Sequence, residues 1–275
     1  MTPQASRSVS SLPPTPVLRE SVGSIAVLTL DSPATRNALS EAMITALHDE
    51  LNSIRHDKRV RAVVIAANGP AYSSGHNLKE LTARRADADK GRAYFAHMMK
   101  SCSDMMQTIV HLPKPVVAAV QGIATAAGCQ LVASCDLAVA SDKATFGTPG
   151  IDIGLFCSTP MVALSRNVPR KHAMHMLLTG DHIPAERARE LGLVNSVVPA
   201  GTEREAAIEL ANRIAVKSAY TLKIGKEAFY RQAEMTLADA YTYASQVMTE
   251  NMMAHDAEEG IGAFIEKRDP KWEDR

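Results

Sequence analysis

Short apolar runs separated by amphipathic helical patterns constrain the fold of this chain more than any other feature. Five runs are rich in β-branched residues or alanine, and they occupy residues 25–30, 62–66, 115–120, 137–140 and 196–198. Apolar runs of this length are typical of strands buried on both faces, as in a parallel sheet. Gly, Pro, Asp or Asn lies near each run, where a turn would bound the strand.

The intervening segments show the spacing of amphipathic helices. From residue 41 to 55 apolar residues recur at steps of four and three, and Ser40 is placed as an N-cap. Similar stripes over residues 237–248 and 257–264 predict that the last third is mostly helical. The strand and helix alternation over residues 20–200 predicts an α/β body of right-handed crossover units. The later helices must then cover some surface, and a partner subunit is one candidate.

Composition limits the classes of partner. Thirty Lys and Arg residues balance thirty Asp and Glu residues, so no overall field favours nucleic acid or an anionic membrane. No apolar run approaches the roughly 20 residues needed to span a bilayer, and the first residues lack the order of a secretory signal. We therefore predict a cytoplasmic protein with no nucleic-acid partner and no membrane insertion. An organelle-targeting role of residues 1–16 is the alternative, although Arg7 is the only basic residue there and the prolines oppose an amphipathic helix.

The chain is predicted to form one domain with a flexible start. Residues 1–16 are rich in Ser and Pro and lack aromatic residues, a composition that does not offset the entropy of ordering. We expect an α/β core over residues 17–200 and a helical C-terminal region over residues 201–275. The four cysteines show no CxxC pairing, and no His follows at zinc-finger spacing, so no metal site is predicted.

Three segments carry residues suited to chemistry. Residues 71–81 (AYSSGHNLKEL) and 121–131 (QGIATAAGCQL) are small-residue turns after apolar runs, and residues 146–160 form the third segment. Small residues let the backbone approach a ligand, and a helix that opens with them leaves free N–H groups at its positive end. Such groups suit a developing negative oxygen. Tight packing is the alternative interpretation of each turn taken alone.

Four motifs in order resemble the crotonase (enoyl-CoA hydratase/isomerase) family, from about residue 17 to residue 272. They are PATRNALS at residues 33–40, SGHNLKEL at 74–81, the stretch 122–136 and FGTPGI at 146–151. The resemblance implies the crotonase (ClpP-like) α/β fold, a spiral of ββα units with residues 201–275 as a helical trimerisation region. It also implies a homotrimer or a hexamer. Residues 73–76, 126–136 and 154–160 most resemble one particular member.

The resemblance implies an acyl-CoA ligand whose thioester oxygen is bound by two backbone N–H groups, here those of His76 and Ala127. Two fixed donors stabilise the enolate that forms when the α-carbon loses or gains a proton. Coenzyme A enters as part of the substrate, and no prosthetic group is expected. Ala127 replaces a usual glycine, and its methyl group could narrow the pocket. The His76 ring could titrate near neutral pH, although the resemblance assigns the role to its amide.

The two glutamates of the family's hydratases correspond to Gln130 and Gly150. Glutamine can hold a water but does not ionise, and glycine brings no side chain. We therefore expect crotonyl-CoA hydration to be slow or absent. Asp152 is a candidate base, because alternate residues of an extended segment share a face; alternatively it is a cap or surface carboxylate. An anion or an ordered water could also replace the missing group.

The third segment leaves its pocket residues open. Cys157, Ser158 and Thr159 could line the acyl pocket, or the two hydroxyl groups could cap the helix that follows. Which of Phe156, Met161 or Tyr72 reaches the acyl group is not determined by the sequence.

For coenzyme A itself the resemblance implies contacts along Arg36 and the backbone of residues 76–79, which includes Asn77, Leu78 and Lys79. Lys267 is a further candidate, since cations near the C-terminus could meet the phosphates from a neighbouring subunit. A solvated basic end is the alternative.

Two function classes remain. One is an enzyme acting through an enolate, as an isomerase, a lyase or a weak hydratase. The other is a catalytically inactive acyl-CoA binder or regulatory pseudoenzyme. A serine hydrolase is disfavoured, because no GxSxG motif occurs.

Overall fold

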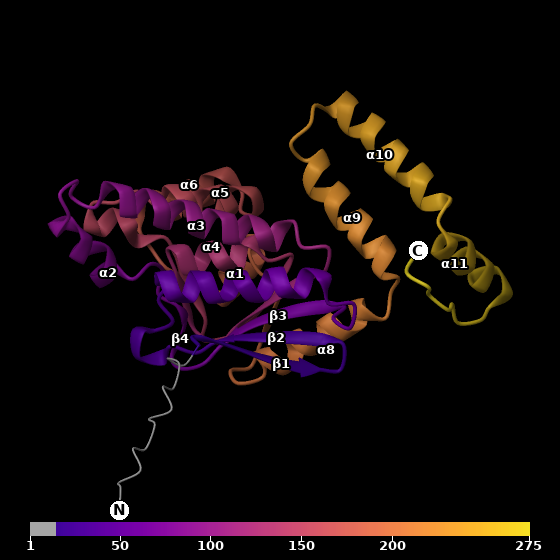
Figure 1. Ribbon diagram of the computed structural model, residues 1–275, viewed down its shortest axis with the longest axis horizontal. Coiled ribbons are helices and arrows are strands. Elements are labelled where there is room, and N and C mark those ends of the chain that lie inside the picture. Colours follow the sequence, from indigo (N-terminus) through magenta and orange to yellow (C-terminus); the bar gives the residue numbers. More distant parts are fainter. Residues whose placement is uncertain (1–14) are drawn as a thin grey trace, which may run out of the picture.

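The computed structural model describes residues 15–275, so most of the predicted flexible tail lies outside the described residues. The molecule consists of an α/β body and an arm of three helices that extends to one side (Figure 1). Within residues 15–275 no helix combines the length and the apolar character needed to cross a membrane.

A six-stranded sheet forms the centre of the body. Its order is β1 (Val17–Val22), β2 (Ile25–Leu30), β3 (Ala62–Ala67), β5 (Val116–Val120), β7 (Leu137–Ser141) and β10 (Ser196–Val198). β1 is antiparallel to β2, and the other neighbours are parallel. The five predicted runs are the five parallel strands. β1 escaped prediction because only Val17 of this edge strand is buried.

A second sheet was not predicted, because its strands are only two or three residues long. It contains β4 (Ala71–Ser73), β6 (Ile123–Thr125), β8 (Thr145–Gly147) and β9 (Ile183–Pro184) in that order. The pairs β3–β4, β5–β6 and β7–β8 each give one strand to each sheet, and helices follow each pair. This is the expected spiral of ββα units. The ends of β4, β6 and β8 thereby become neighbours.

Helices cover both faces of the large sheet. One face packs against α1 (Glu41–His56), α3 (Arg92–Val110) and α4 (Ala127–Ser134). The other packs against the alanine stripe of α8 (Glu203–Ala215). The predicted helix over residues 41–55 is confirmed, and Ser40 caps it, because its Oγ accepts the Met43 N–H at 3.2 Å.

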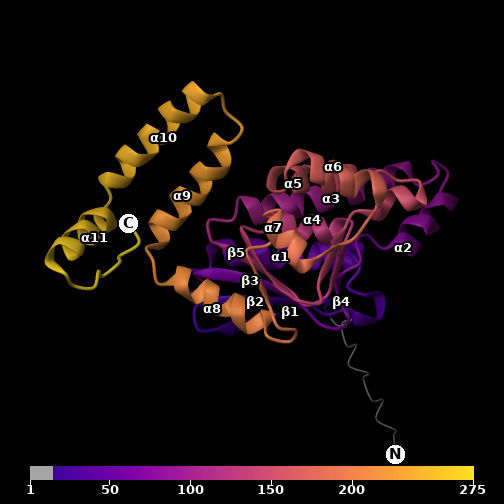
Figure 2. The same ribbon diagram turned by 180° about the vertical axis from the view of Figure 1, so that it is seen from behind.

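The remaining helices complete the body and form the arm. The body adds α2 (Leu78–Ala83), α5 (Ser158–Asn167), α6 (Arg170–Thr179) and α7 (Ala185–Glu190). The arm contains α9 (Ala219–Gln232), α10 (Leu237–Met252) and α11 (His255–Glu266), and it stands away from the body in both views (Figures 1 and 2). The helical C-terminal region is therefore confirmed, whereas the boundary at residue 200 stays a prediction.

One buried ion pair anchors the arm to the body. The Nζ atom of Lys226, on α9, lies 2.6 Å from Oδ2 of Asp136, and it also donates to two backbone carbonyls at 3.0 Å. The Tyr230 hydroxyl donates to the other carboxylate oxygen at 2.9 Å. Because both charges are largely buried, this pairing fixes the point from which the arm extends.

Candidate functional site

The first turn of the site follows β4. Gly75 has φ of 80°, which suits glycine, and its carbonyl accepts the Leu39 N–H at 2.8 Å. The carbonyl of one residue and the N–H of the next point in opposite directions across a trans peptide. The Leu39 bond therefore directs the His76 N–H away from Leu39.

The second turn follows β6 and opens α4. Ala126 has φ of 51° and ψ of −119°, a conformation that is costly for a residue with a side chain. Its N–H donates to the Gly147 carbonyl at 2.9 Å, and its own carbonyl accepts the Gln130 N–H at 3.0 Å. By the same peptide geometry the Ala127 N–H points out of the helix start.

The two turns lie side by side. A methyl group placed on Gly75 would lie 3.2 Å from the Ala127 nitrogen and 3.0 Å from the Ala126 Cβ. Among residues 15–275, neither the His76 N–H nor the Ala127 N–H donates a hydrogen bond. The two predicted amides therefore come from adjacent turns. The orientation of each is set by a hydrogen bond to the carbonyl of the same peptide, that of Gly75 or Ala126. Such a pair can hold one oxygen that gains negative charge.

No carboxylate stands at either glutamate position. Gln130 is 5% exposed, and its Oε1 atom is buried without a hydrogen-bond partner in the described part of the chain. Gly150 lies in a 3₁₀ turn, Pro149–Ile153. A Cβ at Gly150 would lie 2.7 Å from the Leu155 carbonyl oxygen and 2.8 Å from the Cys157 Sγ. The space beside Gly150 is thus filled by the segment that precedes α5.

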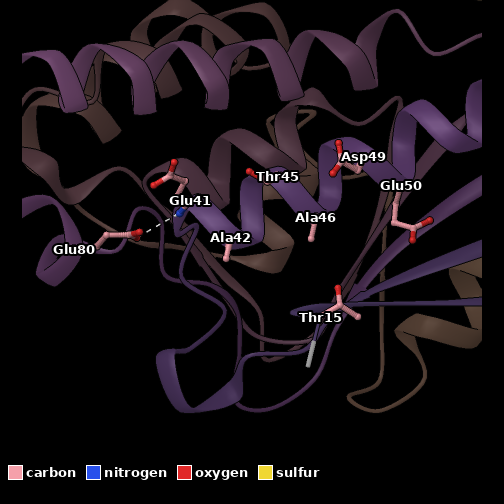
Figure 3. Close-up of a pocket in the computed structure, with 8 residues that line it drawn as sticks. All are labelled: Thr15, Glu41, Ala42, Thr45, Ala46, Asp49, Glu50 and Glu80. Carbon is pink, nitrogen blue, oxygen red and sulfur yellow. Dashed lines mark hydrogen bonds between the residues drawn. The ribbon is translucent and has the colours of Figure 1, made fainter. Parts of the chain in front are cut away.

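Asp152 and Glu80 carry carboxylates that could replace the missing glutamates, but both contact other segments. Asp152 is exposed, and its carboxylate lies against Gly180 at the end of α6, 2.7 Å from where a Cβ would stand. The Glu80 carboxylate accepts the Glu41 N–H at 3.3 Å, at the start of α1 (Figure 3). The position of Asp152 agrees with the surface alternative, and its role as a base stays a prediction.

Burial controls the titratable groups near the turns. The Nε2 atom of His76 is buried without a partner within residues 15–275, and burial lowers the pKa of this ring from its ordinary value of 6.5. The ring is therefore neutral at neutral pH. Burial raises the pKa of the Cys129 thiol to about 12 and also raises the pKa of the Cys157 thiol. Both thiols are protonated and poor nucleophiles.

The predicted coenzyme A contacts are partly brought together. Arg36 is exposed, and its carbonyl accepts the Ser74 N–H at 3.0 Å, so it adjoins the first turn. Asn77 caps α2, because its Oδ1 atom accepts the Glu80 N–H at 3.4 Å. Leu78 and Lys79 are exposed on the first turn of α2.

The C-terminal cation lies apart from this group. Lys267 follows α11, and this helix of the arm lies at the opposite end of the molecule from α2 in both views (Figures 1 and 2). Within one chain it does not join the other predicted contacts.

The acyl candidates differ in accessibility. Tyr72 is fully buried, whereas Phe156 is 39% and Met161 37% exposed. The expectation that Ser158 or Thr159 caps α5 is wrong. The N-cap residue is Cys157 without a side-chain bond, and the Ser158 hydroxyl instead donates to the Phe156 carbonyl.

A separate groove runs along α1 and is unsuited to coenzyme A. The carboxylates of Glu41, Asp49, Glu50 and Glu80 line it (Figure 3). Their negative field would repel the phosphates of the ligand.

Comparison with known proteins defines the class. The profile of the family described as Enoyl-CoA hydratase/isomerase matches residues 20–275, and the chain belongs to this family. It is 48% identical over 245 residues to the mitochondrial enoyl-CoA hydratase domain-containing protein 3 of Rattus norvegicus, covering 89% of this chain and 80% of that protein. This is the member that the three segments of the sequence resembled, and that prediction is confirmed.

Solved structures confirm the fold. The enoyl-CoA hydratase of Mycobacterium smegmatis superposes with a TM-score of 0.88 at 46% identity, covering 94% of this chain and 98% of the other. The human enoyl-CoA hydratase domain-containing protein 3 superposes with a TM-score of 0.88 at 45% identity, covering 94% and 100%. The predicted crotonase α/β fold is therefore confirmed.

The predicted cytoplasmic location is contradicted. The similar proteins of rat, mouse and human are all mitochondrial by name. Balanced charge and the lack of an apolar span bear on membrane insertion, whereas compartments are selected by targeting segments that follow other rules.

Proposed function

We propose that this protein binds acyl-CoA thioesters and stabilises the enolate form of the bound acyl group. The observation that carries the proposal is the adjacency of two amides, those of His76 and Ala127, which donate no hydrogen bond within residues 15–275 and are oriented by their peptides. Main-chain donors do not depend on side-chain identity, so the substitution of alanine for a usual glycine leaves them in place.

The reaction is enoyl-CoA hydratase or isomerase-like, with standard hydration weak or absent. Family membership supports a lyase or isomerase. Hydration needs a group that positions water and transfers a proton, and neither Gln130 nor Gly150 ionises. The filled space at Gly150 also favours the alternative of a catalytically inactive acyl-CoA-binding pseudoenzyme.

Three assays separate these possibilities. Calorimetry with butyryl-CoA and with S-butyl-CoA, a thioether without the carbonyl oxygen, tests the amide pair, and we expect tighter binding of the thioester. Exchange of the α-protons of butyryl-CoA in heavy water tests for a base, because a pure binder gives affinity without exchange. Hydration of crotonyl-CoA, followed by loss of its ultraviolet absorbance, should be slow; rapid turnover would refute this part of the proposal.

We also propose that the chain forms a homotrimer or a hexamer through its arm. Phe229, Tyr241 and Phe264 are 65%, 70% and 84% exposed in the single chain. Apolar surface of this kind marks an interface. Assembly would also bring Lys267 of one subunit to the acyl-CoA site of a neighbouring subunit, where it could contact the phosphates. Sedimentation velocity measures the state directly, and a monomer at micromolar concentration would contradict it.

A further inference from the structure

One buried side chain touches both turns of the candidate site. Ser73 ends β4 and is completely buried. Its hydroxyl donates to the Asn37 carbonyl at 2.8 Å and accepts the Gly75 N–H at 3.3 Å. The Gly75 peptide that follows carries the His76 N–H, so the Ser73 hydroxyl helps to set the orientation of that donor.

The same residue supports the second turn. A Cβ on Gly128 would lie closest to the Ser73 carbonyl oxygen and 2.8 Å from the Ser73 Cβ, so the first turn of α4 packs on the backbone and the Cβ of Ser73. Gly128 adjoins Ala127, whose N–H is the second donor. The backbone and Cβ of Ser73 therefore separate the two turns, whereas its hydroxyl bonds to Gly75 in the first turn.

The base on which Ser73 rests is rigid. Asn37 is fully buried, and its Nδ2 atom donates to the Asn68 and Ala71 carbonyls, both at 2.8 Å. Its Oδ1 atom accepts the Ser32 N–H at 2.8 Å. Three bonds to two segments, the turn after β2 and the connection from β3 to β4, hold the Asn37 backbone where the Ser73 hydroxyl meets its carbonyl.

We infer that Ser73 is a positioning residue whose hydroxyl fixes the orientation of the His76 amide, so that this amide and the Ala127 amide meet on the thioester oxygen. The inference rests on the proposed function, because it presumes that the His76 and Ala127 amides bind that oxygen. Ser73 itself is too deeply buried to touch the ligand. Its loss should therefore change recognition of the carbonyl oxygen and leave recognition of the rest of coenzyme A intact.

The test compares two ligands that differ only at this oxygen. Dissociation constants for butyryl-CoA and S-butyl-CoA are measured by calorimetry for the wild type and for Ser73→Ala, and their ratio reports the contribution of the carbonyl. We expect Ser73→Ala to reduce the preference for the thioester about three- to tenfold, the range of one hydrogen bond. Binding of S-butyl-CoA should be unchanged.

Ser141→Ala is the matched control. Ser141 is also a completely buried serine at a strand end, and its Oγ accepts the N–H two residues on, that of Lys143, at 3.0 Å. The Ser141→Ala variant should lose about as much stability as Ser73→Ala, but it should keep the wild-type ratio of the dissociation constants for the two ligands. If Ser73→Ala does not fold, Ser73→Cys keeps the volume with a weaker donor, and an intermediate loss of preference is expected.

The outcomes distinguish the two ideas. If the wild type binds both ligands equally, the proposed amide site fails. If the wild type prefers the thioester and Ser73→Ala or Ser73→Cys keeps the full preference, the amide site stands and the role of Ser73 is overturned. An equal loss in Ser73→Ala and Ser141→Ala also overturns it, because that loss would reflect general destabilisation.

Discussion

Restoring a glutamate at residue 150 should destabilise this protein and fail to create a hydratase. The Cβ of a Gly150→Glu side chain would lie 2.7 Å from the Leu155 carbonyl oxygen and 2.8 Å from the Cys157 Sγ. The first neighbour is backbone, so it cannot move aside as a flexible side chain would. Overpacking of this kind costs about 1–3 kcal/mol, which lowers Tm by roughly 2–12 °C for a chain near this size.

The assay is thermal unfolding together with crotonyl-CoA hydration. Gly225→Ala is the control, because Gly225 lies in α9 with no atom of the described residues within 4 Å of its added Cβ, and alanine keeps this arm surface apolar. That change should leave Tm unchanged or raise it slightly, since glycine is a poor helix former. Gly150→Glu with Cys157→Ala removes one of the two clashes and should recover part of the lost Tm. A Gly150→Glu variant that melts with the wild type and hydrates crotonyl-CoA would refute the reasoning.

Three further changes test other parts of the structure. Ala126→Gly relieves the backbone at φ of 51° and should stabilise the protein by about 1 kcal/mol in chemical denaturation; an unchanged midpoint would contradict the strain. Lys226→Met leaves the Asp136 carboxylate buried without its ion pair and should lower the free energy of unfolding by about 3–5 kcal/mol in chemical denaturation. A loss below about 1 kcal/mol would show that other contacts hold the arm. Burial lowers the pKa of His76 in the folded state, so the unfolded chain binds this proton more tightly than the folded chain. The free energy of unfolding should therefore decrease as pH falls below 6.5 and level off below the folded pKa. His76→Gln should weaken the pH dependence of Tm in thermal melts. An equal pH dependence in the wild type and the variant would contradict the role of His76.

The sequence predicted the large sheet and the helices because their signals are local. Each parallel strand is an apolar run bounded by turn residues, and the helix from residue 41 has both its apolar stripe and its Ser40 cap. The second sheet gave no such signal, since strands of two or three residues show no periodicity. β4, β6 and β8 each follow a strand of the large sheet, which is a property of the repeating unit, and β9 follows α6 and pairs antiparallel with β8.

The candidate site was predictable only where its chemistry lies in the main chain or in a missing side chain. The glycine and alanine turns indicated free amides, and the resemblance to the family implied that Gln130 and Gly150 stand in place of two glutamates. The filling of the space at Gly150 by Leu155 and Cys157 could not be predicted, because it depends on the path of a loop. Ser73 was missed for a related reason: a serine in a short strand is ordinary, and its contacts come from segments far away in the sequence.

Hydration requires both binding of the thioester oxygen and proton transfer, and different parts of the structure bear on each. In the proposed function, binding a thioester oxygen needs two amides held in place, and the bonds to the Gly75 and Ala126 carbonyls hold the peptides that carry them. Proton transfer needs an ionisable group on one side of the bound acyl chain, and there the loop before α5 occupies the space beside Gly150. A single substitution can restore a charge but cannot move that loop. Under the proposed function, any proton transfer uses a group other than Gln130 and Gly150, and heavy-water exchange at the α-carbon decides whether such a group exists.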